Sequence, residues 1–108
     1  MVKTIQLRRY QLAEGGYDAF LEWWAGLIVP IRLRMGYQLE FAYFVPESNE
    51  IVWAASVPGD RREWDRVEAA YEANPERIEA FAKLAPGVIL SKRLDFVAVP
   101  DLTGALAG

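Results

Sequence analysis

Four segments of the chain have a pattern typical of β-strands, either alternating apolar and polar residues or a short apolar run. These segments are residues 2–12, 37–45, 50–57 and 88–100. The third, "EIVWAASV", is apolar on both faces, which predicts a central strand that is covered on both sides. The turn "PESN" before it predicts a hairpin between the second and third strands.

The first helical pattern covers residues 17–35 and has an apolar stripe at the 3.6-residue period. The stripe consists of Phe20, Trp23 or Trp24, Leu27 and Ile31. Because neighbouring helix positions lie ~100° apart, one tryptophan should pack under the sheet. The other should lie near the helix edge, against either the second helix or a partner chain. Pro30 predicts a kink, or a break followed by a new turn. Gly36 stands where a helix commonly ends.

The second helical pattern covers residues 61–73, starts after Asp60 as N-cap, and is followed by a short helix over 75–84. Acidic residues alternate with arginines along both helices, and we interpret them as a solvated face. These acids are Glu63, Asp65, Glu68, Glu72, Glu76 and Glu79.

The predicted order β-α-β-β-α-β is that of the ferredoxin-like α+β fold. Two helical regions would cover one face of a four-stranded antiparallel sheet. A length of 108 residues fits a single domain over 1–108, with an ordered core at about 2–100 and a short C-terminal tail.

The choice of strand faces leads to a prediction about assembly. With Ile5 and Leu7 assigned to the helix side, Tyr10 and Trp53 fall on the opposite face, which would expose a large apolar patch in a monomer. A C2 homodimer, sheet face against sheet face, would bury this patch and could leave a cavity. A monomer with a modest apolar face is the alternative.

Arg8, on the same face, needs a partner if that face is covered. Glu40 falls on this face by strand parity. Arg8 and Glu40 then form either a structural ion pair beside Tyr10, or an anion-binding arginine in a cavity with Tyr10 as donor or proton relay. Trp53 either lines that cavity or belongs to the dimer core. The candidate ligand site is therefore Arg8, Tyr10, Glu40 and Trp53.

Composition excludes several chemistries. The chain has no cysteine and no histidine, so thiolate nucleophiles, zinc-thiolate sites and histidine-ligated haem are excluded. We expect no metal and no cofactor. The net charge is −3 without a basic stripe, which argues against nucleic-acid binding. No apolar run or signal peptide is present, and we expect a cytoplasmic protein without a membrane partner.

Three stretches together resemble the NIPSNAP family. They are "IQLRRYQLAEGGYDAFLEWW", "GLIVPIRLRMGYQL" and "NEIVWAASVPGDRREWDRVEAAYEANPE", and the resemblance covers about residues 5–97. It implies a dimeric α/β-barrel fold and a homodimer built on sheet faces.

The resemblance implies no assigned reaction, so three hypotheses about function stay open. The first is a NIPSNAP-like protein that binds a small apolar or aromatic ligand between the sheets of a homodimer. The second, suggested by relatives in the wider dimeric α/β-barrel group, is a cofactor-independent monooxygenase acting on a quinol or polyphenol. The third is a non-catalytic interaction module.

Overall fold

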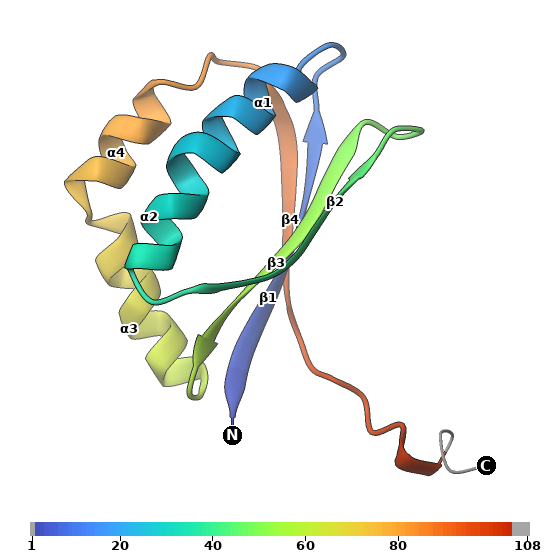
Figure 1. The fold of residues 1–108 in the computed structure, drawn as a ribbon, viewed down its shortest axis with the longest axis vertical. Helices are drawn as coiled ribbons and strands as arrows, with labels where there is room; N and C mark the ends of the chain where they lie inside the picture. The colour runs from blue at the N-terminus through green and yellow to red at the C-terminus, as the bar shows by residue number, and fades with distance from the viewer. Residues whose placement is uncertain (1, 105–108) are drawn as a thin grey trace.

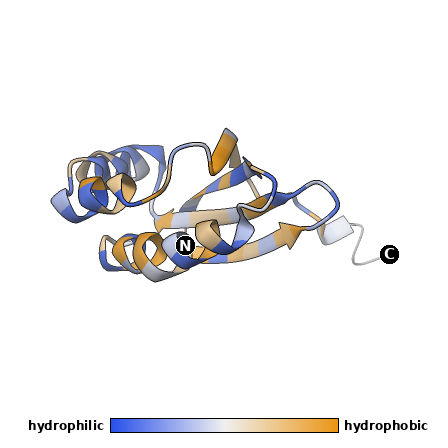
Figure 2. Cartoon of the chain, turned by 90° about the horizontal axis from the view of Figure 1, so that it is seen from above, coloured by the Kyte–Doolittle hydropathy of each residue, from blue (hydrophilic) through white to orange (hydrophobic). Residues whose placement is uncertain are grey.

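The computed structural model describes residues 2–104, which form a four-stranded antiparallel sheet with helices on one side (Figures 1 and 2). The elements are β1 (Lys3–Leu12), α1 (Tyr17–Trp23), the π-helical segment η1 (Trp24–Ile28), α2 (Val29–Arg34), β2 (Gln38–Val45), β3 (Glu50–Pro58), α3 (Arg61–Glu72), α4 (Pro75–Ala82) and β4 (Ile89–Val97). The strand order is β2-β3-β1-β4. This confirms the predicted α+β fold and the central third strand. The expected C-terminal tail lies in part outside the described residues.

The helical region α1–η1–α2 is continuous and contains a π-helical segment, Trp24–Ile28, just before Pro30. Pro30 has no N–H, and in a regular α-helix its ring would clash with the carbonyl four residues earlier. The helical turn just before the proline is wider than an α-helical turn, because the Val29 N–H donates to the carbonyl of Trp24, five residues earlier. Helix α2 ends at Arg34, and Gly36 follows with a φ of 105°, which glycine readily adopts. The Tyr37 N–H then donates to the Arg32 carbonyl at 3.1 Å, which closes the helix end.

The two tryptophans divide as the helical period predicted. Trp24 packs under the sheet, with its ring centroid 5.2 Å from that of Trp53. Trp23 turns toward α4, where its Nε1 donates to the Ala80 carbonyl at 2.7 Å. The N-cap prediction at Asp60 is also confirmed, because its side chain accepts a hydrogen bond from the Glu63 N–H.

The predicted assignment of strand faces is wrong. The buried residues of β1 are Gln6, Arg8, Tyr10 and Leu12, and those that share their face on β3 are Ile51, Trp53, Ala55 and Val57. These side chains meet the helices, while Ile5 and Leu7 lie on the other side, which we name the outer face. The physical reason is that both faces of these central strands carry apolar side chains, so alternation alone could not decide between them.

A bulge in β2 also changes the predicted parity. Leu39 pairs with Ala55 but Phe41 pairs with Ala54, so Glu40 is the extra residue in β2. Phe41 therefore lies on the outer face, and Glu40 contacts outer-face residues.

Candidate functional site

Charged and aromatic side chains from most elements converge between the sheet and the helices. We name this group the central cluster. Its members are Arg8 and Tyr10 of β1, Arg32 of α2, Tyr37, Trp53 of β3, Glu68 and Tyr71 of α3, Arg77 of α4 and Lys92 of β4. The cluster thus joins the layers of the fold through polar and cation–π contacts rather than through aliphatic packing alone.

Glu68 holds the middle of the central cluster. Its carboxylate lies 3.3 Å from Nη2 of Arg8 and 3.6 Å from Nη1 of Arg32. It also accepts a hydrogen bond from the hydroxyl of Tyr37 at 2.9 Å. The prediction that all acids of this helix form a solvated face is therefore wrong at this position, because two buried arginines hold Glu68 inward.

Arg8 brings three of the four predicted site residues together. Its Nε donates to Gln6 Oε1 at 2.8 Å, and its Nη1 donates to the hydroxyl of Tyr10 at 3.0 Å. Its guanidinium carbon lies 5.3 Å from the centroid of the Trp53 ring. Arg8, Tyr10 and Trp53 are thus neighbours, although inside the subunit rather than on the outer face.

Glu40 does not join them, so the predicted Arg8–Glu40 pair is wrong. Glu40 accepts hydrogen bonds from Lys3 Nζ at 2.9 Å and from Ser56 Oγ at 2.6 Å. The hydrogen bonds from Ser56 and Lys3 lower the pKa of this carboxyl below its usual value. The bulge is the cause, because it moves Glu40 off the parity that a regular strand would give it.

Arg32 belongs to the central cluster, although the sequence pattern did not single it out as a site residue. Its side chain is buried, and the guanidinium carbon lies 4.2 Å from the ring centroid of Tyr71 and 4.7 Å from that of Tyr37. No side-chain nitrogen of Arg32 donates a hydrogen bond to a described residue. The contact with Glu68, at 3.6 Å, is too long to count as a hydrogen bond.

Positive charge exceeds negative charge in the central cluster. It holds four cations and one carboxylate, that of Glu68, which pairs with buried Arg8 and Arg32. Arg77 is half-buried and Lys92 is exposed. Within residues 2–104, neither Arg77 nor Lys92 forms an ion pair. The Arg77 guanidinium carbon lies 4.1 Å from the ring centroid of Phe81, and Lys92 Nζ lies 5.0 Å from the ring centroid of Tyr10. Burial and the charges of the nearby arginines lower the pKa of Lys92.

Several buried polar atoms of the central cluster have no hydrogen-bond partner among the described residues. They are Nε and Nη1 of Arg32, Nε1 of Trp53, the hydroxyl of Tyr71 and Nε of Arg77. Burial is the main cause that raises the pKa of both Tyr37 and Tyr71, so both phenols are neutral at pH 7. The unmet atoms are therefore all able to donate, which makes the cluster a site for acceptors.

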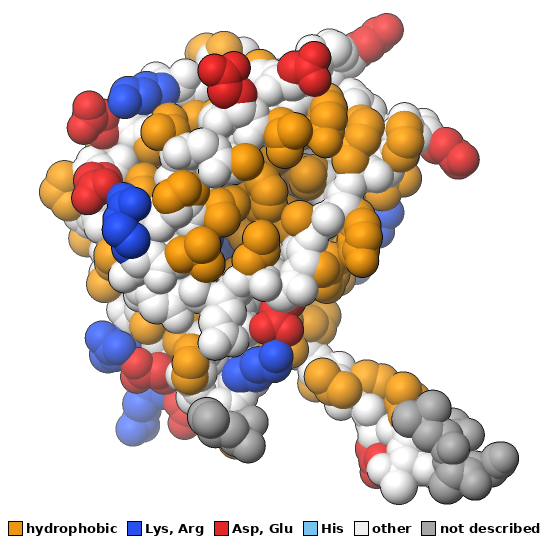
Figure 3. Space-filling view, in the orientation of Figure 1, with side chains coloured by type: hydrophobic (Ala, Val, Ile, Leu, Met, Phe, Trp, Pro, Cys, Tyr) orange, Lys and Arg blue, Asp and Glu red, His pale blue; other side chains and the backbone are white. Residues whose placement is uncertain are grey.

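A narrow hollow opens between α2 and β2 above part of the central cluster. It has a cavity volume of about 10 Å³, and no polar atom is exposed in it. Its lining residues are Val29, Arg32, Leu33, Tyr37, Gln38, Leu39, Trp53 and Ala55. Figure 3 shows apolar side chains gathered between these helices and the strands. The hollow therefore has an apolar rim, with Arg32 and Trp53 among the residues that line it.

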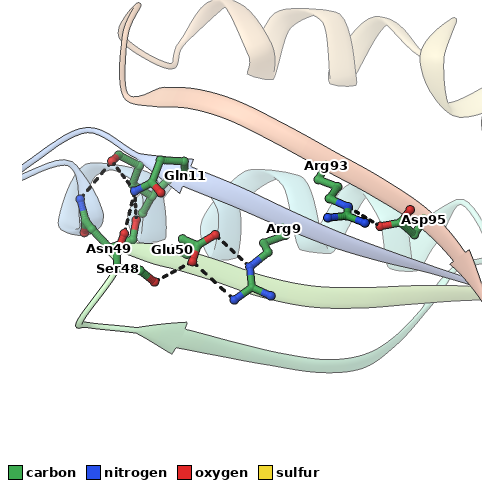
Figure 4. A network of polar contacts seen from close by, with 8 residues as sticks. Arg9, Gln11, Ser48, Asn49, Glu50, Arg93 and Asp95 are labelled. Atoms are coloured by element: carbon green, nitrogen blue, oxygen red, sulfur yellow. Dashed lines mark hydrogen bonds and ion pairs between the residues drawn. The ribbon is translucent and has the colours of Figure 1, made fainter.

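The outer face carries apolar side chains and exposed ion pairs. Figure 4 shows two of these pairs, Arg9–Glu50 at 2.9 Å and Arg93–Asp95 at 3.0 Å. The apolar residues include Ile5, Leu7, Phe41, Tyr43 and Val52. Phe41 and Tyr43 are 37% and 67% exposed in the single chain, so no other element covers this edge of the sheet.

The described residues contain neither a group of metal ligands nor a helix that could span a membrane. In residues 2–104, no three histidine, cysteine, aspartate or glutamate side chains stand close enough to hold a metal ion. No helix in the same part of the chain has the length and apolar character that crossing a membrane requires.

The described features define a ferredoxin-like α+β protein with a cation-rich interior. No protein-family model matches the sequence, and no curated protein matches it either. Solved structures do match.

A NIPSNAP-like domain protein from Burkholderia xenovorans is 19% identical, with a TM-score of 0.79 over 92% of this chain and 86% of that one. A NIPSNAP family protein with unknown function from Agrobacterium tumefaciens strain C58 is 18% identical, with a TM-score of 0.77 over 88% of this chain and 86% of that one. A second NIPSNAP family protein from that strain is 10% identical, with a TM-score of 0.81 over 93% and 95%. The chain therefore has the fold of NIPSNAP proteins, as the sequence resemblance implied.

Proposed function

We propose that this chain is a NIPSNAP-like protein that forms a homodimer and binds a small organic ligand in the central cluster of each subunit. The observation that carries the proposal is the group of buried donors in the central cluster that have no partner among the described residues. More than about 90% of buried polar groups in proteins are hydrogen-bonded, and each unmet one costs about 1–3 kcal/mol. A ligand with acceptor atoms would supply the missing partners.

Aromatic rings favour a planar or aromatic ligand. Tyr37 and Trp53 line the hollow, and Trp53 also contacts Tyr10 edge to face with centroids 5.9 Å apart. Rings of this kind offer both apolar surface and polar edges to a bound molecule. This placement differs from a cavity between two sheets, because the candidate residues point toward the helices.

The outer face is then left for the homodimer. Its exposed apolar side chains on β2, together with those of the central strands, form a surface that isolated soluble proteins seldom expose. A second copy of the same face would bury it by two-fold symmetry.

The monooxygenase alternative requires a base that removes a proton from a quinol. Tyr37 and Tyr71 are held neutral, and Glu68 is engaged by two arginines and a hydroxyl. Lys92, with its lowered pKa, is the remaining candidate within the central cluster. The central cluster thus has more hydrogen-bond donors without partners than groups able to accept a proton, which supports ligand binding rather than proton abstraction. It also disfavours an interaction module with a filled interior.

Native mass spectrometry of freshly purified protein tests both parts of the proposal. We expect a dimer, and a mass increase or a gain in thermal stability when a panel of small aromatic compounds is added. Val52→Glu should produce monomers because it places a charge on the outer face, whereas Ile78→Glu, on exposed α4 surface, should leave the dimer intact. A wild-type monomer refutes the dimer, and a dimer that no compound in the panel stabilises refutes the ligand site.

A further inference from the structure

We infer that residues 98–104, which we name the arm, pack on the outer face of a second copy of this chain, beside Phe41 and Tyr43 of that copy. This inference rests on the proposed homodimer and names the segments that meet in it. After β4 the chain runs away from both the sheet and the helices (Figure 1). Every residue of the arm is exposed, including Val99 at 77% and Leu102 at 47%. The arm therefore presents apolar side chains that its own subunit does not cover.

The arm starts on the outer side of the sheet. Val97, the last residue of β4, pairs with Ile5, whose side chain lies on the outer face. Residues two apart in an extended stretch point to the same side, so Val99 follows Val97 on the side of the outer face. Pro100 has no N–H and is unsuited to a central strand, which favours a segment that leaves its own sheet.

The matching apolar surface lies at the opposite edge of the sheet. In the strand order β2-β3-β1-β4, β2 and β4 are the two edge strands. Phe41 and Tyr43 lie on the outer face of β2, with ring centroids 5.6 Å apart. The strands β3 and β1 separate them from the arm of the same subunit, which runs away from the sheet (Figure 1). Exposed apolar side chains thus occur at both edges, and neither set covers the other within one chain.

A two-fold axis parallel to the strands brings these two edges together. When two copies stack by their outer faces about such an axis, β4 of one copy lies over β2 of the other. Val97 pairs with Ile5, Ile5 with Ser56, and Ser56 with Gln38, so the end of β4 is level with the start of β2. The axis preserves this level. The arm of one copy therefore emerges near Phe41 of the other copy, and symmetry repeats the contact.

The arm is long enough for this contact. Stacked sheets lie about 10 Å apart, and an extended chain advances roughly 3.3 Å per residue. The stretch from Val97 to Leu102 therefore spans about 16 Å when it is extended, which is more than the distance between the sheets. Contact of Val99 and Leu102 with the exposed rings of β2 would remove apolar surface of both segments from water, which favours association.

Sedimentation equilibrium of full-chain variants tests the inference. Val99→Glu and Leu102→Glu should each raise the dissociation constant of the dimer about a hundredfold, because burial of one such side chain shifts an equilibrium about tenfold and a homodimer has two arms. Both residues are exposed in the single chain, so the circular dichroism spectrum should stay unchanged. Ile78→Glu, on the exposed surface of α4, is the matched control and should leave the dissociation constant unchanged.

Cross-linking locates the surface that receives the arm, and the chain has no cysteine that would interfere. Leu102→Cys is mixed with a mass-tagged Phe41→Cys variant and treated with a short bismaleimide. We expect linked pairs of the two different chains, and no such pairs when Ile78→Cys replaces Phe41→Cys. A chain that carries both Leu102→Cys and Phe41→Cys should give a linked dimer rather than an internally linked monomer.

The outcomes separate the two proposals. A wild-type dimer whose dissociation constant is unchanged in Val99→Glu and Leu102→Glu overturns the arm inference and leaves the proposed homodimer standing. An internally linked monomer means that the arm folds onto its own subunit, and linked pairs with Ile78→Cys alone mean that it binds the helices; either result overturns the inference. A wild-type monomer at every concentration refutes the proposed homodimer itself.

Discussion

Glu68→Gln should destabilise the protein more than the loss of an exposed acid on the same helix. The substitution keeps the shape and one acceptor oxygen but removes the negative charge that two buried arginines share. Arg8 and Arg32 have side chains that are 10% and 6% exposed, so water cannot replace the lost carboxylate well. Removing one partner of a buried ion pair typically costs 3–5 kcal/mol, and we expect about 3 kcal/mol because the glutamine still accepts hydrogen bonds.

Urea unfolding followed by tryptophan fluorescence measures this effect. With a slope of about 1–3 kcal/mol per molar urea for a chain of this size, a loss of about 3 kcal/mol lowers the midpoint by roughly 1–3 M. Wild type and variant must be compared at one protein concentration, because the midpoint of a dimer depends on concentration.

Glu63→Gln is the matched control. Glu63 lies one turn earlier on α3 and pairs with exposed Arg66, so its loss should change the midpoint little. In an Arg32→Gln background, Glu68→Gln should also cost less than in the wild type, because one of the two buried charges is gone. Equal midpoints for the Glu68 and Glu63 variants would refute the view that the central cluster depends on this carboxylate.

Three further predictions concern pH and backbone conformation. The pKa values of Tyr37 and Tyr71 are raised above 10.0 in the folded protein, so the unfolded chain loses these protons first as the pH rises. The free energy of unfolding should therefore fall as the pH rises above 10.0. Urea unfolding at several pH values should show a less steep fall for Tyr71→Phe than for the wild type. The pKa of Lys92 is lowered below 10.5 in the folded protein, so the unfolded chain binds this proton more tightly. The free energy of unfolding should therefore rise as the pH approaches 10.5, and Lys92→Met should remove this increase. Gly36→Ala should lower stability by about 1–3 kcal/mol, because Gly36 has a φ of 105° that alanine adopts only with strain. Gly26→Ala should raise stability by about 0.5–1 kcal/mol, because Gly26 lies in a helical segment with open space around its Cα. Thermal unfolding measures both effects.

The order of strands and helices could be predicted because each element has a strong local signal. The short turn "PESN" and the caps at Asp60 and Gly36 mark boundaries through the conformations that those residues favour. The face of β1 could not be predicted in the same way. Ile5 and Leu7 are more apolar than Arg8, yet Arg8 is on the helix side because Glu68, 60 residues later, and Gln6 and Tyr10 satisfy it.

The candidate site depends on the same long-range contacts. Strand spacing correctly placed Arg8, Tyr10 and Trp53 on one face, and the structure pairs Arg8 with Trp53. It failed at Glu40, because a single extra residue in β2 reverses parity without a clear sequence signal. Glu68 looked like any other acid of a charged helix, since the pattern of one helix does not reveal which side chain meets a buried arginine on another element.

Arg32 reaches the central cluster through the π-helical segment. In a regular α-helix, each step of four residues rotates ~40° beyond a full turn. Arg32 is three such steps after Phe20, so the two side chains would point about 120° apart around the helix axis. The wider turn at Trp24–Ile28 absorbs part of this drift, and both Phe20 and Arg32 are buried against the same core. Pro30 favours this wider turn because it has no N–H to donate. The proline that interrupts the helical pattern therefore helps to turn an arginine, which would otherwise face solvent, toward Glu68 and the proposed ligand site.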